Sequence, residues 1–171
     1  MTAEHAGHGW EEMGTIVTRS GTVAFAVNRI LGEGFVFRSD MLVDSGTIAD
    51  FEGAIVMHAA ASEKPLTVER YVDDEGVVTA ARISLVDDFN DALEDEGEWE
   101  ETGALSLLLG DCVACDPRTR GERHRIDFSV RRGRYGVERL LLPVGEDEPP
   151  SVAALQVRMR GAGRPPRDRR G

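Results

Sequence analysis

Two cysteines stand three residues apart, at Cys112 and Cys115. Thiolates at this spacing can bind zinc or form a redox-active disulfide if a turn brings them together. His124, or the pair His5 and His8, could complete a zinc site. In an extended strand, however, side chains three residues apart point to opposite faces, which prevents both chelation and disulfide closure. We therefore predict two small buried hydrophobic side chains and no metal.

A second group of side chains could support general acid–base catalysis. A histidine within reach of several carboxylates is what a small hydrolase or a metal-dependent enzyme needs. The residues that could supply such a site are Asp44, Asp50, His58 and Asp116. The hypothesis requires these four side chains to converge on one pocket, whereas structural roles would leave them scattered. The chain holds no nucleophile elbow, P-loop or dinucleotide-binding motif, so we expect no cofactor.

The hydrophobic periodicity predicts a mainly β (α+β) protein. The spacing of Phe51, Ile55 and His58 is typical of one face of a helix, so we predict a helix near 49–61. Elsewhere apolar and polar residues alternate, which favours strands. The predicted strands lie within 14–30, 66–72, 77–86, 104–109, 112–115, 126–130, 135–142 and 151–159.

An internal repeat organises these strands. Trp10-Glu11-Glu12 is followed by Gly14 and Gly21, and Trp99-Glu100-Glu101 is followed at the same intervals by Gly103 and Gly110. Half of this chain would make only a thin core, so we predict two related antiparallel β halves packed face to face in one sandwich-like domain. The predicted boundaries are a first half at 10–86, an acidic connector at 87–98, a second half at 99–160 and a disordered Arg/Pro tail at 161–171.

The charge is distributed unevenly. The net charge is -11, yet residues 1–117 alone hold 24 acidic against 6 basic side chains. Such a body disfavours nucleic acid and favours a basic protein partner, so we predict a non-enzymatic acidic interaction protein. The alternative is a DNA mimic, in which the acids of 87–101 line up along one surface. The predicted partner-binding residues are Asp87, Asp88, Asp91, Glu94, Asp95 and Glu96.

Arginines are concentrated after the acidic body. Arg131, Arg132 and Arg134 could form an anion-binding loop, or they could neutralise the acidic first half. Nucleic acid is expected to bind, if at all, only through the Arg/Pro tail.

No apolar run reaches the length that a membrane helix needs, and the N-terminal residues lack the features of a signal peptide. We therefore expect a cytoplasmic protein with reduced thiols and no membrane association.

Residues 103–159 resemble an uncharacterised bacterial β-rich family. The match rests on Val113-Ala114-Cys115-Asp116-Pro117 and on Gly133-Arg134-Tyr135-Gly136-Val137. Arg132 and Gly136 stand where the family has proline. Residues 43–50, VDSGTIAD, match a further family segment, although here they precede the other two. Some members of the family are associated with bacterial toxins, so the resemblance implies an immunity-type inhibitor and no particular catalytic activity.

Overall fold

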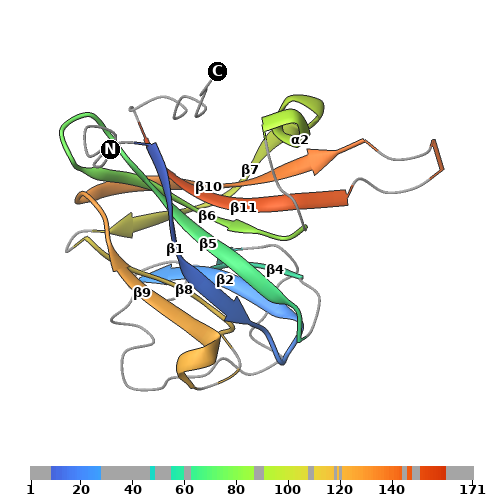
Figure 1. Cartoon of the computed structure of the whole chain (residues 1–171), viewed down its shortest axis with the longest axis horizontal. Helices are drawn as coiled ribbons and strands as arrows, with labels where there is room; N and C mark the ends of the chain where they lie inside the picture. Colours follow the sequence, from blue (N-terminus) through green and yellow to red (C-terminus); the bar gives the residue numbers. More distant parts are fainter. Residues whose placement is uncertain are drawn as a thin grey trace, which may run out of the picture.

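The chain forms two antiparallel β-sheets that pack on each other. The computed structural model describes residues 9–27, 47–48, 55–59, 63–86, 91–107, 110–117, 119, 121–143, 146–147 and 151–160. Sheet A has the strand order β1-β5-β6-β11-β10-β7, and sheet B has the order β3-β4-β2-β8-β9. Figure 1 shows the two layers, with the short helix α2 above sheet A. The predicted mainly β, sandwich-like fold is confirmed.

The strands and helices have the following bounds. Sheet A contains β1 (Gly9–Val17), β5 (Pro65–Val72), β6 (Val78–Ser84), β7 (Glu98–Leu107), β10 (Gly133–Leu142) and β11 (Ser151–Met159). Sheet B contains β2 (Thr22–Val27), β3 (Thr47–Ile48), β4 (Ile55–Ala59), β8 (Asp111–Cys115) and β9 (Arg125–Ser129). The helices among the described residues are α2 (Asp91–Glu96), within the predicted connector, and the 3-10 helix η3 (Glu122–His124).

The core lies between the facing sides of the two sheets. Phe25 and Phe128 meet edge to face in sheet B, with ring centroids 6.3 Å apart. Ile83, Tyr135 and Leu155 close the core from sheet A and are buried. These residues alternate with outward-facing side chains, which is why the period-two pattern of the sequence predicted the strands.

The predicted helix near 49–61 is wrong where the structure describes it. Residues 55–59 form strand β4, which pairs with β2 on one side and with β3 on the other. Ile55 and Val56 are β-branched and fit a half-buried sheet better than a helix. Backbone hydrogen bonds to two distant strands therefore override the local three- and four-residue spacing. The remaining residues of the predicted helix lie outside the described part.

The internal repeat reappears as a two-fold pattern of strands. One side of sheet A consists of β1, β5 and β6, and these strands correspond to β7, β10 and β11 on the other side. In sheet B, the pair β4-β2 corresponds to the pair β9-β8. Arg82 pairs with Gln156 where the halves meet in sheet A, and Phe25 pairs with Ala114 where they meet in sheet B. The halves are thus related as predicted, but they do not pack face to face. Each sheet contains strands from both halves, because the two halves hydrogen-bond to each other once in sheet A and once in sheet B.

The repeated glycines have repeated conformations. The register shifts between Glu12 and Gly14 in β1, and it shifts beside Gly103 at the same point of β7. Gly21 and Gly110 then turn the chain into sheet B with φ of 80° and 77°. A side chain is disfavoured at such a φ, so the repeat keeps glycine there.

Gly110 also touches backbone, which gives a prediction with a matched control. A Cβ at Gly110 would lie 2.5 Å from the carbonyl oxygen of Val130, whereas a Cβ at Gly76, with a φ of 82°, would meet nothing within 4 Å. Gly76→Ala should cost about 1 kcal/mol for its φ alone. Gly110→Ala should cost at least twice as much, because the clash adds to the same φ penalty. Urea unfolding of both variants measures this, and equal losses would contradict it.

Candidate functional site

The catalytic hypothesis can be examined at Asp116, whose side chain lies in the described part. Asp44 and Asp50 lie outside the described residues. His58 is in β4, where its Cα pairs with that of Val23, and its side chain is not described. Of the four predicted side chains only that of Asp116 is described, so their convergence stays a prediction.

Asp116 holds a turn together. The residue is 2% exposed and follows the last residue of β8. Its carboxylate accepts hydrogen bonds from the backbone N–H groups of Arg19 and Ser20, both at 2.9 Å, and from the hydroxyl of Ser20 at 2.7 Å. The hydroxyl of Thr119 donates a fourth bond at 2.8 Å. These four donors hold the carboxylate in place, so it fixes the β1–β2 turn against the end of β8.

The cysteines behave as the strand geometry predicted. Cys112 points into the core beside Ala114, and Cys115, three residues on, points to the other face of β8. Burial raises the pKa of the Cys112 thiol well above its ordinary value and raises that of Cys115 to about 12. Both side chains are free thiols and stay protonated near neutral pH, whereas nucleophilic attack and metal binding need the thiolate.

His124 connects two elements. Its Nδ1 donates to the carbonyl oxygen of Val17 at the end of β1, and its own carbonyl accepts from the N–H of Asp116 at 2.8 Å. The imidazole thus links η3 to β1. Within the ranges that the structure describes, no group of three His, Cys, Asp or Glu side chains could hold a metal ion.

A row of six polar side chains, one per strand, crosses the outer face of sheet A. We call it the polar row, and sequence reasoning missed it. In spatial order it consists of Glu12, Glu69, Arg82, Gln156, Glu138 and Glu101. The row is symmetric about its centre, because Glu12 and Glu69 of the first half correspond to Glu101 and Glu138 of the second.

Arg82 is the centre of the first half of the row. The side chain is 8% exposed, and its Nη2 lies 3.0 Å from Glu69 Oε1. Its Nη1 lies 3.9 Å from Glu94 Oε2, which comes from α2. The guanidinium also stacks on Trp10, 4.0 Å from the ring centroid. Arg82 therefore joins helix, sheet and edge strand in one cluster.

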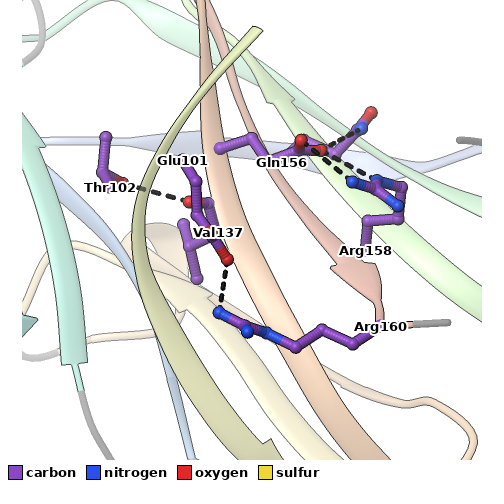
Figure 2. Close-up of polar contacts among 7 residues, drawn as sticks. Glu101, Thr102, Val137, Gln156, Arg158 and Arg160 are labelled. Carbon is purple, nitrogen blue, oxygen red and sulfur yellow. Dashed lines mark hydrogen bonds and ion pairs between the residues drawn. The ribbon is translucent and has the colours of Figure 1, made fainter. Parts of the chain in front are cut away.

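Glu138 is the centre of the second half. It is 5% exposed, accepts from Gln156 Nε2 at 3.3 Å and forms an ion pair with Arg158 at 3.0 Å (Figure 2). This bonding raises the pKa of the Arg158 guanidinium. Arg160 pairs with Glu101 in the same view. Each of these two carboxylates has its own guanidinium, so the row stabilises the sheet rather than offering an open acid and base.

The bulge of β7 lies beside this row. Thr102, the extra residue of the bulge, donates its hydroxyl to the carbonyl oxygen of Val137 at 3.3 Å (Figure 2). A Cβ at Gly136 would lie 2.8 Å from Glu101 Oε1. The absence of a side chain at Gly136 therefore leaves room for the Glu101–Arg160 pair.

The predicted partner-binding acids have different environments. Glu94 points inward to Arg82, so it does not belong to an exposed face. Asp95 and Glu96 are exposed at the end of α2. Asp87 and Asp88 lie outside the described residues, as does the side chain of Asp91 in α2.

Exposed carboxylates lie where α2 ends and β7 begins, and further ones lie on the β10–β11 turn at the same end of sheet A. Glu98 pairs with Leu141, near the end of β10, so the β10–β11 turn continues from this same end of the sheet (Figure 1). We call this surface the acidic end. Its exposed residues are Asp95, Glu96, Glu98, Glu146 and Asp147. The nearby Arg139 forms an ion pair with Glu100, with Nη2 2.6 Å from Oε1.

The predicted anion-binding residues are all exposed: Arg131 and Arg132 lie on the turn between β9 and β10, and Arg134 lies at the start of β10. None of the ion pairs among the described residues includes them. Arg125 and Arg139, which flank them in the chain, are paired with Asp127 and Glu100. The three arginines therefore do not neutralise the acidic first half through direct ion pairs with described residues.

Comparisons with known proteins give no relative. No family model matches the chain, no curated protein matches it, and no solved structure matches it. Within the described residues, no helix is long and apolar enough to cross a membrane.

Proposed function

We propose that this protein is a non-enzymatic interaction protein whose acidic end binds a basic protein partner. The observation that supports the proposal most directly is the concentration of exposed carboxylates at one end of sheet A. Asp95, Glu96 and Glu98 come from α2 and β7, and Glu146 and Asp147 come from the β10–β11 turn. Two separate segments of the chain thus add charge of one sign at the same end of sheet A.

Such a surface favours association with a partner of opposite charge. Carboxylates within roughly 8 Å of one another reinforce each other's field at physiological salt, because that is the range over which screening acts. The field steers a basic partner toward this end and raises the association rate. Glu98 lies in β7, whose pairing with β10 fixes its backbone, and this lowers the entropic cost of binding at that residue.

An immunity-type inhibitor is the form of this function that the resemblance to the bacterial family suggests. A basic nuclease or toxin would present the charge that the acidic end needs. In that form, the carboxylates would cover the cationic surface with which the target holds its own substrate.

Affinity capture tests the proposal. The immobilised full chain is exposed at low salt to an extract of its native host, eluted with a salt step, and the eluate is identified by mass spectrometry. We expect one basic protein that a variant D95N/E96Q/E98Q no longer retains. Recovery of no protein by the folded chain, or equal retention by the variant, would contradict the proposal.

A further inference from the structure

We infer that Arg131 and Arg132, on the turn between β9 and β10, and Arg134, at the start of β10, form a binding site for the phosphate groups of a nucleic acid. We call it the arginine turn. It is distinct from the acidic end and does not rest on the function proposed for that surface. Two structural observations support it: the backbone of the turn is fixed and its guanidinium groups are exposed. The sequence after Arg160 adds further arginines.

The backbone of the arginine turn is held at several points. The N–H of Arg131 donates to the carbonyl oxygen of Val78 at 2.8 Å, and the hydroxyl of the buried Tyr135 donates to the carbonyl of Arg131 at 2.6 Å. Just before the turn, the N–H of Val130 donates to the carbonyl oxygen of Gly110 at 2.8 Å. The turn is thus tied to β6, to the core and to the β7–β8 connection, so less backbone entropy is lost when a ligand binds.

The guanidinium groups of the arginine turn are available to a ligand. All three side chains are exposed, and none takes part in the ion pairs of the described residues. Arg158 and Arg160, by contrast, are engaged by Glu138 and Glu101. A guanidinium with no carboxylate at hand offers its planar pair of donors to phosphate oxygens.

The sequence near the C-terminus is also positively charged. The N–H of Arg160 donates to the carbonyl oxygen of Arg134 at 2.8 Å, so the C-terminal residues start directly beside the arginine turn. The sequence 161–171 adds four arginines and one acid. Within the described residues, the arginine turn alone places three exposed guanidinium groups within four positions, which suits several phosphates of a backbone rather than one isolated anion.

The rest of the surface restricts where a nucleic acid can lie. Arg131 is bonded to Val78 at the base of the β5–β6 hairpin, whose tip carries exposed Asp74 and Glu75. These carboxylates and the acidic end repel a polyanion. Binding therefore occurs at the arginine turn alone, and it involves contacts to phosphate more than to bases, which makes it insensitive to sequence.

Salt dependence measures this contact. A short mixed-sequence DNA duplex with a fluorophore serves as the probe, titrated with the full chain between about 50 and about 200 mM salt. Each phosphate contact adds about 0.9 to the slope of log affinity against log salt. The variant R131Q/R132Q/R134Q should therefore lower this slope by about 2 to 3 and weaken binding at low salt at least tenfold.

Three control variants test whether the phosphate contacts belong to the arginine turn. R131K/R132K/R134K keeps the charge and should keep most of the slope. R19Q/R123Q removes exposed arginines elsewhere and should leave the slope unchanged. D74N/E75Q removes nearby repulsion and should tighten binding. The inference is overturned if the full chain does not bind the duplex, if the glutamine variant binds as tightly as the native chain, or if only vesicles of anionic lipid are bound.

Discussion

Arg82→Ala should destabilise the protein by about 3 to 5 kcal/mol, because it removes a buried cation from two largely buried carboxylates. The side chains of Glu69 and Glu94 are only 23% and 10% exposed, and both face this guanidinium. Trp10 would also lose the cation on which its ring stacks. For a chain of this size, the loss corresponds to a fall of roughly 10 °C in Tm.

Arg139→Ala is the matched control for this substitution. Arg139 also pairs with a glutamate across two strands of sheet A, but its partner Glu100 is 49% exposed. An exposed pair contributes about 0 to 1 kcal/mol, so this variant should unfold at almost the native urea concentration. Losses of unfolding free energy of similar size in Arg82→Ala and Arg139→Ala would contradict the view that burial makes the polar row stabilising.

Asp116→Ala should cost about 3 kcal/mol, since the N–H groups of Arg19 and Ser20 lose their acceptor along with two hydroxyls. Asp116→Asn keeps one of the two oxygens and should lose less. Asp111→Asn changes an exposed aspartate at the other end of β8 and should lie within about 0.5 kcal/mol of the native chain. Urea unfolding of the three variants checks this order.

The outcome at Asp116 also bears on the catalytic hypothesis. A catalytic carboxylate is often replaceable without loss of stability, since it is held for reaction rather than for folding. Unchanged stability of Asp116→Ala would contradict the structural role and return this residue to the candidates for chemistry.

The sequence predicted those features that depend on local pattern or on repetition. Strands such as β11 follow from the alternation of apolar and polar residues, and the paired Trp-Glu-Glu segments predicted the two related halves. The opposite orientation of Cys112 and Cys115 follows from the geometry of one strand. None of these predictions needed knowledge of which strands are neighbours.

Features that depend on pairing between distant strands escaped prediction. The apolar residues of β4 have helical spacing in the sequence, and only the pairing of β4 with β2 and β3 makes it a strand. The polar row joins six strands, and its members are ordinary surface residue types until the register places them side by side. Glu69 and Glu138 occupy equivalent positions of the repeat, and this was the signal in the sequence that could have pointed to them.

The side-by-side arrangement of the halves has the same cause. Hydrophobic patterning tells which face of a strand is buried, but not which sheet the strand joins. Here each half lacks enough strands to close its own sandwich. Pairing of β6 with β11 and of β2 with β8 solves this in both sheets at once.

The affinity of the captured basic partner for two charge-matched variants tests the central claim most directly. D95N/E96Q/E98Q removes three charges from the acidic end, and E63Q/D111N/E122Q removes three exposed charges elsewhere. We expect the first variant to bind at least tenfold more weakly than the native chain and the second to bind within about twofold of it. Equal weakening by both variants would mean that net charge alone attracts the partner, and it would contradict a binding surface at the acidic end.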